Sequence, residues 1–143
     1  MSHTMSEETL SGSCLCGSVA FRIHGDALRF YHCHCERCRK SSGTGHASNI
    51  IVKPISVTWT AGRDLIHRYR LPAAKRYGTA FCTVCGSPVP RVAADNSYAV
   101  IPAGTLDREP EIEPEARIFH GSRAEWSCDD DGLPVHERYP PRN

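Results

Sequence analysis

Three cysteines stand within six residues of one another, at Cys33, Cys35 and Cys38. Cys33 and Cys35 are two residues apart, so their side chains leave the same face of an extended backbone. The Cys35-x-x-Cys38 spacing lets a tight turn bring a third sulfur to the same point. Structural zinc is usually closed by four protein ligands, whereas catalytic zinc keeps a position for water or substrate. Three converging thiolates therefore predict a metal site that performs chemistry.

Four other cysteines form two pairs, Cys14-x-Cys16 and Cys82-x-x-Cys85. Because zinc is closed by four ligands, a division into four and three leaves none of the seven thiolates without a metal. That division joins the two pairs in a structural site and leaves the central three cysteines as the open site. The spacing also permits Cys14 and Cys16 to join the central three instead. Gly86 follows the second pair and supplies the positive φ with which a backbone turns its N–H groups toward sulfur.

The length and charge of the chain limit the partners that it can have. Its 143 residues are the size of a single domain with a hydrophobic core. Its 17 Lys and Arg residues balance 16 Asp and Glu residues, and the two signs are interspersed. This balance gives no electrostatic basis for binding nucleic acid or an anionic membrane. We therefore expect neither of these partners, and a small-molecule substrate instead.

A disulfide framework is the alternative use of many cysteines, and it usually accompanies a secretory signal. Residues 1–10 are polar and acidic without an apolar core, and no 18-residue apolar run occurs in the sequence. We therefore expect a cytoplasmic protein with zinc-bound thiols, and a disordered or tag-like segment over residues 1–11. Cys128 lies outside the three clusters and is predicted to be a free thiol.

Short stretches of alternating apolar and polar residues recur along the chain, which is the period-2 pattern of half-buried strands. The predicted strands cover residues 18–24, 27–32, 46–52, 55–60, 65–71, 76–81, 97–102 and 117–120. Gly25-Asp26 predicts a turn between two strands, and Pro54 predicts a break in another. A helical turn is expected over residues 36–41, but no 12-residue stretch has helical periodicity. The pattern predicts a single, mainly β domain of antiparallel strands that is pinned by two zinc sites.

Several motifs occur in an order and spacing that resemble one known family. They are Gly12-Ser13-Cys14-Leu15-Cys16-Gly17, Cys33-His34-Cys35-x-x-Cys38-Arg39-Lys40 with Ser42-Gly43, Phe81-Cys82-x-x-Cys85-Gly86-Ser87, Gly104-Thr105-Leu106-Asp107, and Ile118-Phe119 with Trp126 and Gly132-Leu133-Pro134. This set resembles the glutathione-dependent formaldehyde-activating enzymes, a family that includes the centromere-protein-V-like domains. The resemblance runs over residues 12–134 and leaves residues 135–143 as a C-terminal tail.

The resemblance implies a β-tent-like fold with two zinc ions in each chain. The structural ion would be held by Cys14, Cys16, Cys82 and Cys85. The catalytic ion would be held by Cys33, Cys35 and Cys38. The implied reaction adds the thiol of glutathione to formaldehyde, gives S-hydroxymethylglutathione, and is classed by its reverse as a carbon–sulfur lyase reaction. Arg117 stands where the family usually has a histidine, and His120 follows instead.

The open site would have to bind a thiol whose unperturbed pKa is about 8.5. Zinc deprotonates a coordinating thiol, while three thiolates already give the site a net charge of minus one and weaken its Lewis acidity. We therefore favour capture of the thiol over polarisation of the aldehyde. Arg37, Arg39 and Lys40 are predicted to offset this charge and to bind the carboxylates of glutathione. The alternative is that they are solvated surface cations.

Three histidines flank the central cysteines, at His32, His34 and His46. Strand alternation directs His34 away from the sulfurs of its two neighbours. We interpret all three as residues that orient the ligands or pack beside them. A fourth zinc ligand from this group is the less favoured alternative.

Three classes of function fit these residues. The first is a zinc-dependent enzyme that acts on thiol adducts of formaldehyde or another small aldehyde, with glutathione as co-substrate. The second is a zinc-stabilised binding module without catalysis, and the third is a protein that stores labile zinc or responds to thiol stress. For the enzyme we expect a monomer or a homodimer.

Overall fold

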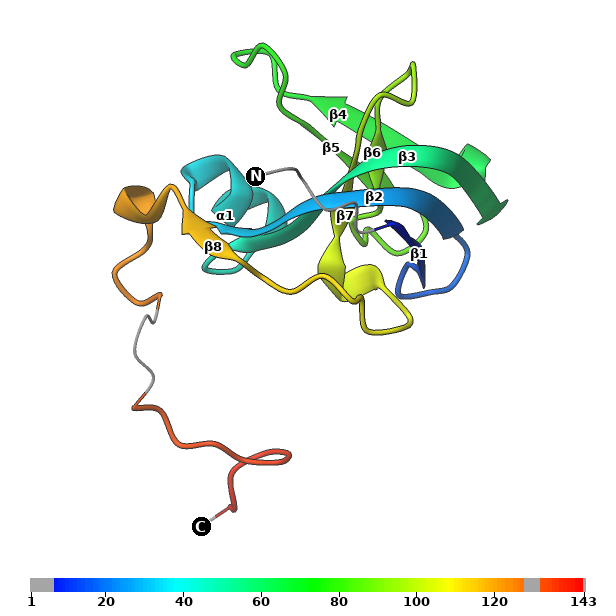
Figure 1. Cartoon of the computed structure of the whole chain (residues 1–143). Helices are drawn as coiled ribbons and strands as arrows, with labels where there is room; N and C mark the ends of the chain where they lie inside the picture. The colour runs from blue at the N-terminus through cyan, green and yellow to red at the C-terminus, as the bar shows by residue number, and fades with distance from the viewer. Residues whose placement is uncertain (1–6, 128–131, 143) are drawn as a thin grey trace.

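Two long neighbouring strands form the centre of the fold, β2 (Ala20–Cys33) and β3 (Ala47–Ala61). They pair antiparallel from Ala20↔Ala61 to Cys33↔Ala47 and run through the middle of the molecule (Figure 1). The computed structural model describes residues 7–127 and 132–142. The predicted free thiol at Cys128 lies outside the described residues.

Smaller strands extend this pair into a six-stranded sheet with the order β1-β2-β3-β7-β6, in which β8 also pairs with β2. The pairing of β8 with β2 is parallel, and the other pairings of this sheet are antiparallel. A second sheet consists of the antiparallel strands β4 and β5. The added strands are β1 (Glu7–Ser13), β4 (Ile66–Arg70), β5 (Gly78–Cys82), β6 (Arg91–Val92), β7 (Ala99–Pro102) and β8 (Ala116–Ile118). The predicted mainly β, antiparallel architecture is therefore confirmed, with β8 as a parallel addition.

The helical elements are short, and all but the last lie between strands. The helical turn predicted over residues 36–41 is confirmed as α1 (Glu36–Ser42). Single 3-10 turns are η1 (Arg63–Leu65), η2 (Ala103–Thr105) and η3 (His120–Ser122). In the described part of the chain, no helix has the length and hydropathy that crossing a bilayer requires.

Two predicted interruptions of the long strands are absent from the structure. Gly25 was expected in a turn, but β2 continues through it with a shift of register between His24 and Gly25. Here the strands approach so closely that a Cβ at Gly25 would collide with the carbonyl oxygen of Lys53. Pro54 pairs with Gly25, so the residue without an N–H sits beside an irregularity of the ladder, where proline is tolerated. The turn and the break were therefore wrong predictions.

The N-terminal end of the described chain also differs from the expectation, of which residues 1–6 lie outside the described residues. Strand β1 begins at Glu7, so residues 7–11 are not the disordered or tag-like segment that the sequence predicted. Leu10 is buried in the core, and the Glu8 carboxylate accepts hydrogen bonds from the N–H groups of Glu111 and Ile112 at 3.0 and 3.2 Å. The polar composition of this segment concealed a strand because its outward-facing residues, Glu7, Thr9 and Ser11, are all polar.

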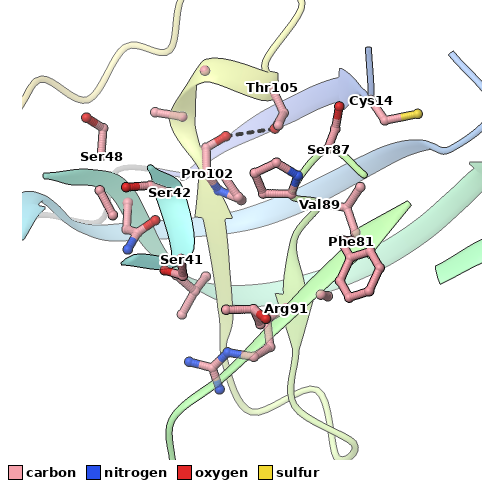
Figure 2. A pocket seen from close by; sticks show the side chains of 18 of the residues that line it. Cys14, Ser41, Ser42, Ser48, Phe81, Ser87, Val89, Arg91, Pro102 and Thr105 are labelled. Carbon is pink, nitrogen blue, oxygen red and sulfur yellow. Dashed lines mark hydrogen bonds between the residues drawn. The ribbon is translucent and has the colours of Figure 1, made fainter. Parts of the chain in front are cut away.

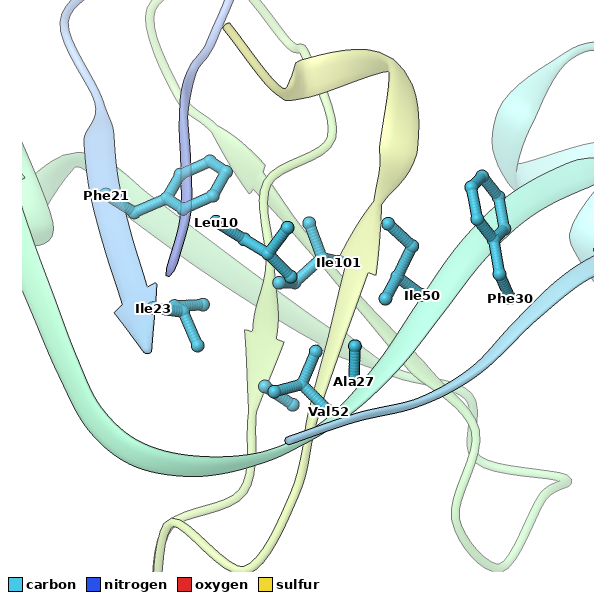
Figure 3. Close-up of a cluster of buried hydrophobic side chains, with 9 residues drawn as sticks. Leu10, Phe21, Ile23, Ala27, Phe30, Ile50, Val52 and Ile101 are labelled. Carbon is cyan, nitrogen blue, oxygen red and sulfur yellow. The ribbon is translucent and has the colours of Figure 1, made fainter. Parts of the chain in front are cut away.

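The main core lies between β1, β2, β3 and β7, where inward-facing side chains of the four strands meet (Figure 3). Its buried members are Leu10, Phe21, Ile23, Ala27, Phe30, Ile50, Val52, Ala99 and Ile101. A second, smaller core contains Cys14, Val19, Ala80, Cys82 and Val89. Trp59 of β3 packs against both cores. Two of the clustered cysteines thus belong to the packing that joins β5 to the large sheet.

Candidate metal centres and the cavity between them

The first cysteine cluster contains Cys14, Cys16, Cys82 and Cys85, whose sulfurs all lie within 4.8 Å of one another. The Cys14 and Cys16 sulfurs are 3.7 Å apart, and those of Cys16 and Cys82 are 4.0 Å apart. A tetrahedral zinc ion with Zn–S bonds of about 2.3 Å requires sulfur separations of about 3.8 Å, whereas a disulfide requires about 2.0 Å. The donor set and its spacing therefore fit a closed zinc site, and Cys14 and Cys16 do not join the central three.

Backbone turns around this cluster direct N–H groups at sulfur. The N–H of Val19 donates to Cys14 Sγ at 3.3 Å, and the N–H of Val84 donates to Cys82 Sγ at 3.4 Å. Gly86 has a φ of 77° and donates its N–H to the carbonyl of Cys82 at 2.7 Å, as the sequence predicted for a residue that closes this turn. Such hydrogen bonds favour the charged form of a thiol, which is the form that binds a metal.

Ser87 connects the two halves of the closed cluster. Its Oγ accepts a hydrogen bond from the N–H of Leu15 at 3.2 Å and lies 3.2 Å from Cys85 Sγ. The hydrogen bond with the Ser87 side chain lowers the pKa of the Cys85 thiol to about 5. Hydrogen bonds from Ser18 likewise lower the pKa of Cys16. Cys85 therefore ionises readily at neutral pH, and Cys16 ionises more readily than an unperturbed thiol.

Replacing Ser87 with alanine is expected to weaken zinc binding at the closed cluster by about tenfold to a hundredfold, the usual cost of losing a group that orients a ligand. The lost hydrogen bond raises the pKa of Cys85, so zinc should also be released at a higher pH than from the wild type. Competition with a chromophoric chelator across a pH series measures both effects. The exposed Ser56→Ala on β3 is the matched control, and equal zinc retention in Ser87→Ala and Ser56→Ala would contradict this role of Ser87.

The second cluster contains Cys33, Cys35 and Cys38, whose sulfurs also lie within 4.8 Å of one another. Cys33 ends β2, Cys35 caps the N-terminus of α1, and Cys38 lies in the first turns of that helix. No further His, Cys, Asp or Glu side chain in the described parts of the chain brings a ligand atom within that distance of all three sulfurs. The division into four and three is therefore confirmed, and the second cluster has the donor set of an open site.

Local structure holds the three sulfurs in place. Cys35 Sγ accepts the N–H of Cys38 at 3.3 Å, and Gly43 ends α1 in the left-handed region while its N–H donates to the carbonyl of Arg39. Burial raises the pKa of the Cys33 and Cys38 thiols. Their thiolate forms therefore need a compensating positive charge, and a divalent cation bound by all three sulfurs supplies it.

The histidines near the open cluster form a layer beside it. His34 is fully buried, and Arg117 Nη1 lies 3.1 Å from its Nε2. The His46 ring is stacked on His32 at 4.2 Å between centroids and lies 5.1 Å from His34, which in turn lies 5.4 Å from His120. Burial and the charge of Arg117 lower the pKa of His46, and burial and the nearby His46 lower that of His32. The four histidines therefore lie next to one another beside the residues of the open cluster, and His120, which the sequence analysis noted only as the histidine that follows Arg117, is one of them.

The three predicted substrate-binding cations lie on α1, next to the open cluster. The Arg37 guanidinium lies over the Tyr77 ring at 5.8 Å, and Lys40 Nζ is 4.0 Å from an oxygen of Glu36 on the exposed side of the helix. Arg39 is partly buried. Within the described residues, none of the three lines the cavity next to the cluster. Their contact with glutathione carboxylates stays a prediction.

A cavity of about 780 Å³ lies between the two cysteine clusters, with Cys38 of the open cluster and Cys14 of the closed cluster in its wall. This volume is within the range that protein sites for small molecules usually have. Several hydroxyl side chains interrupt its largely apolar wall, and Figure 2 shows some of them around the hollow. They include Ser41, Ser42, Thr44, Ser48, Tyr77 and Ser87. The open cluster therefore adjoins a space that can hold a polar small molecule.

Tyr77 is the largest hydroxyl side chain in the wall of the cavity, and the sequence analysis did not identify it. Its Oη is 2.8 Å from Ser41 Oγ and donates to the carbonyl of Arg37 at 3.3 Å. Burial raises the pKa of Tyr77, so its phenol keeps its proton at neutral pH. The residue comes from the β4–β5 connection and meets α1 only in the folded chain, which is why no local sequence pattern indicated it.

Comparisons with known proteins are consistent with this architecture. A sequence model described as glutathione-dependent formaldehyde-activating enzyme matches residues 9–122. The fold is similar to the crystal structure of a Rhodobacter sphaeroides protein, with a TM-score of 0.55 and 17% sequence identity over 76% of this chain and 98% of that chain. No curated protein matches the sequence significantly.

Proposed function

Because the chain belongs to the glutathione-dependent formaldehyde-activating enzyme family, we propose that it is a carbon–sulfur lyase-like enzyme with one structural and one catalytic zinc ion. It would add a thiol, with glutathione as co-substrate, to formaldehyde or another small aldehyde. The observation that carries this proposal is the three-cysteine cluster without a fourth protein ligand among the described residues, next to a cavity that Cys38 lines.

The proposed reaction joins two molecules without an oxidant or reductant. A bond forms between the thiol sulfur and the aldehyde carbon, the carbonyl π bond opens, and the proton of the thiol ends on the new hydroxyl oxygen. Zinc bound at Cys33, Cys35 and Cys38 would lower the pKa of a coordinating thiol and supply a thiolate at neutral pH. Because the three ligand thiolates already make this site anionic, capture of the thiol is favoured over polarisation of the aldehyde.

The hydroxyl groups of Tyr77 and Ser41 are placed where they could stabilise the charge that develops on the aldehyde oxygen. Both line the cavity together with Cys38, and they lie 2.8 Å from each other. As the carbonyl carbon is attacked, negative charge develops on the aldehyde oxygen, and a hydrogen-bond donor already in place stabilises it. We assign this role to the neutral phenol of Tyr77, whose single proton would turn from the carbonyl of Arg37 to the aldehyde oxygen.

Tyr77→Phe is expected to lower kcat by about tenfold to a hundredfold. This loss is at or below the usual loss of kcat when one hydrogen-bond donor to a developing oxyanion is removed. The substitution keeps the ring under Arg37, so the zinc content and the thermal stability should change little. Steady-state kinetics with glutathione and formaldehyde, together with a zinc count, measure these quantities. The exposed Tyr69→Phe on β4 is the control, and unchanged kcat in both variants would remove Tyr77 from the mechanism.

Exchange NMR tests the proposed function as a whole. Formaldehyde and glutathione interconvert with their adduct in solution, and the zinc-loaded protein should broaden their exchanging signals by accelerating this interconversion. The Cys35→Ser variant at the same concentration provides the background rate. An interconversion rate that the wild type leaves unchanged would reject the enzyme and favour a zinc-stabilised binding module.

The proposal also covers the compartment, the partners and the oligomeric state of the protein. Seven thiols that serve as metal ligands require a reducing compartment, and we place the protein in the cytoplasm on that basis. The balanced charge supports a small-molecule substrate in preference to nucleic acid or a membrane surface. A monomer or a homodimer is sufficient, because the residues of both clusters come from one chain.

A further inference from the structure

We propose that Arg91 binds a carboxylate of the thiol substrate, so that the cavity selects anionic thiols over neutral ones. This inference rests on the proposed function and names the class of substrate that the open cluster would take. It adds a cation to those that the sequence predicted for this role, none of which lines the cavity in the described structure.

The strand period places the Arg91 side chain on the cavity side of the chain. Val89 and Arg91 line the cavity between the cysteine clusters. Pro90 and Val92 instead line a separate hollow of about 330 Å³ on the other side of this segment. Pairing of Arg91 with Val100 of β7 fixes this alternation. The orientation of Arg91 therefore depends on the sheet, not on a mobile loop.

Contacts with neighbouring groups hold the guanidinium in one orientation. Its Nη1 donates to Tyr98 Oη at 3.1 Å and to the carbonyl of Arg76 at 3.5 Å, and its central carbon lies over the Tyr98 ring at 5.7 Å. These hydrogen bonds use only one of the three nitrogens, and no carboxylate of the described chain pairs with Arg91. The remaining N–H groups can therefore form the parallel pair of hydrogen bonds that arginine makes with a carboxylate.

The charges around the cavity show why this residue matters. Among the described residues in its wall, Arg91 is the one Lys or Arg, and Asp107 is the one carboxylate. Asp107 accepts a hydrogen bond from Ser13 Oγ at 3.0 Å. Figure 2 shows Arg91 at one side of the hollow, Ser41 and Ser42 of α1 at another, and Thr105 at a third.

An anionic ligand near an anionic zinc–thiolate site requires a cation to offset the repulsion. Arg91 provides that cation inside the same cavity as Cys38. A molecule that carries both a thiol and a carboxylate, such as a cysteine-containing peptide, can bind at the open cluster through its thiol and to Arg91 through its carboxylate. A neutral thiol has no carboxylate and can bind only at the open cluster.

Binding of S-methylglutathione to the zinc-loaded protein tests this inference. The ligand keeps the carboxylates of glutathione but has no thiol to bind zinc, so its affinity reports on carboxylate contacts and not on catalysis. In titration calorimetry, Arg91→Gln is expected to weaken binding by about tenfold to a hundredfold, as for hydrogen bonds to charged groups. Arg68→Gln, which removes an exposed arginine that does not line this cavity, should bind like the wild type.

Kinetics with two thiols separate this inference from the proposed function. For glutathione, Arg91→Gln should raise KM by a similar factor with little change in kcat, whereas for 2-mercaptoethanol both constants should stay as in the wild type. Arg91→Lys, which keeps the charge but not the planar pair of donors, should lie between Arg91→Gln and the wild type, and provides the comparison if Arg91→Gln folds poorly.

Each result has a defined meaning. Equal S-methylglutathione affinity in the wild type and the Arg91 variants, or no binding to the wild type, would overturn the role of Arg91. If the wild type binds this ligand through Arg91 but accelerates no addition of thiol to aldehyde, the carboxylate site stands and the proposed enzymatic function fails.

Discussion

The Cys82→Ser variant is expected to be unfolded or aggregated. Cys82 is fully buried in the smaller core, and its sulfur lies 4.0 Å from that of Cys16 across the closed cluster. Structural zinc in small domains contributes about 10–16 kcal/mol to folding, while whole domains are stable by only about 5–15 kcal/mol. Losing one of four ligands from a site of this kind therefore removes a large part of the stability.

Far-UV circular dichroism and thermal unfolding of the purified variant measure this effect. Val84→Ser is the matched control, because it changes an exposed residue of the same turn and keeps the backbone N–H that Val84 donates to Cys82. A soluble Cys82→Ser variant with wild-type unfolding would show that this cluster has no structural role.

The Cys35→Ser variant is expected to keep its fold but to lose one zinc ion and its catalytic activity. Cys35 caps α1 by accepting the N–H of Cys38, and serine is among the best residues for that position. The helix should therefore persist while the three-sulfur site loses a soft ligand. The expected thiol–aldehyde exchange rate is that of the uncatalysed background.

Atomic emission spectroscopy gives the zinc count, and exchange NMR gives the rate. Glu36→Gln is a suitable comparison in the same helix, because it changes an exposed side chain and leaves all three sulfurs in place. Wild-type turnover by Cys35→Ser would move the chemistry away from this cluster.

The ligands of the open cluster were predictable because they are close together in the sequence. Cys33, Cys35 and Cys38 converge through the end of one strand and the first turns of one helix, so spacing alone was sufficient. The assignment of Cys14 and Cys16 was not decided by spacing, because it depends on the long-range packing that brings β5 beside the turn after β1. The structure decided it, and the family resemblance had implied the same grouping.

The residues that line the cavity were not predictable in the same way. Tyr77 comes from the β4–β5 connection and meets α1 only in the folded chain, and Arg91 lies on β6, so neither is close in sequence to the open cluster. The sequence analysis selected Arg37, Arg39 and Lys40, which are close in sequence to the open cluster but do not line this cavity in the described structure. Proximity along a helix does not determine which face reaches a cavity.

The predicted strand boundaries were wrong at Gly25 and Pro54, because both residues lie inside strands and not at their ends. Gly25 permits a close approach between β2 and β3, and Pro54 occupies the irregular pair opposite it. The sequence around each residue predicts an interruption, because the irregular pairing that accommodates it depends on the partner strand. The parallel addition of β8 beside the end of β2 likewise depends on the path of the intervening chain.

Native mass spectrometry of the freshly purified protein, with and without glutathione, tests the central claim most directly. The account predicts two zinc ions per chain, and a complex with one glutathione that retains both. One zinc ion per chain, or a mass lower by two hydrogens with the central cysteines joined in a disulfide, would contradict an open three-sulfur zinc site.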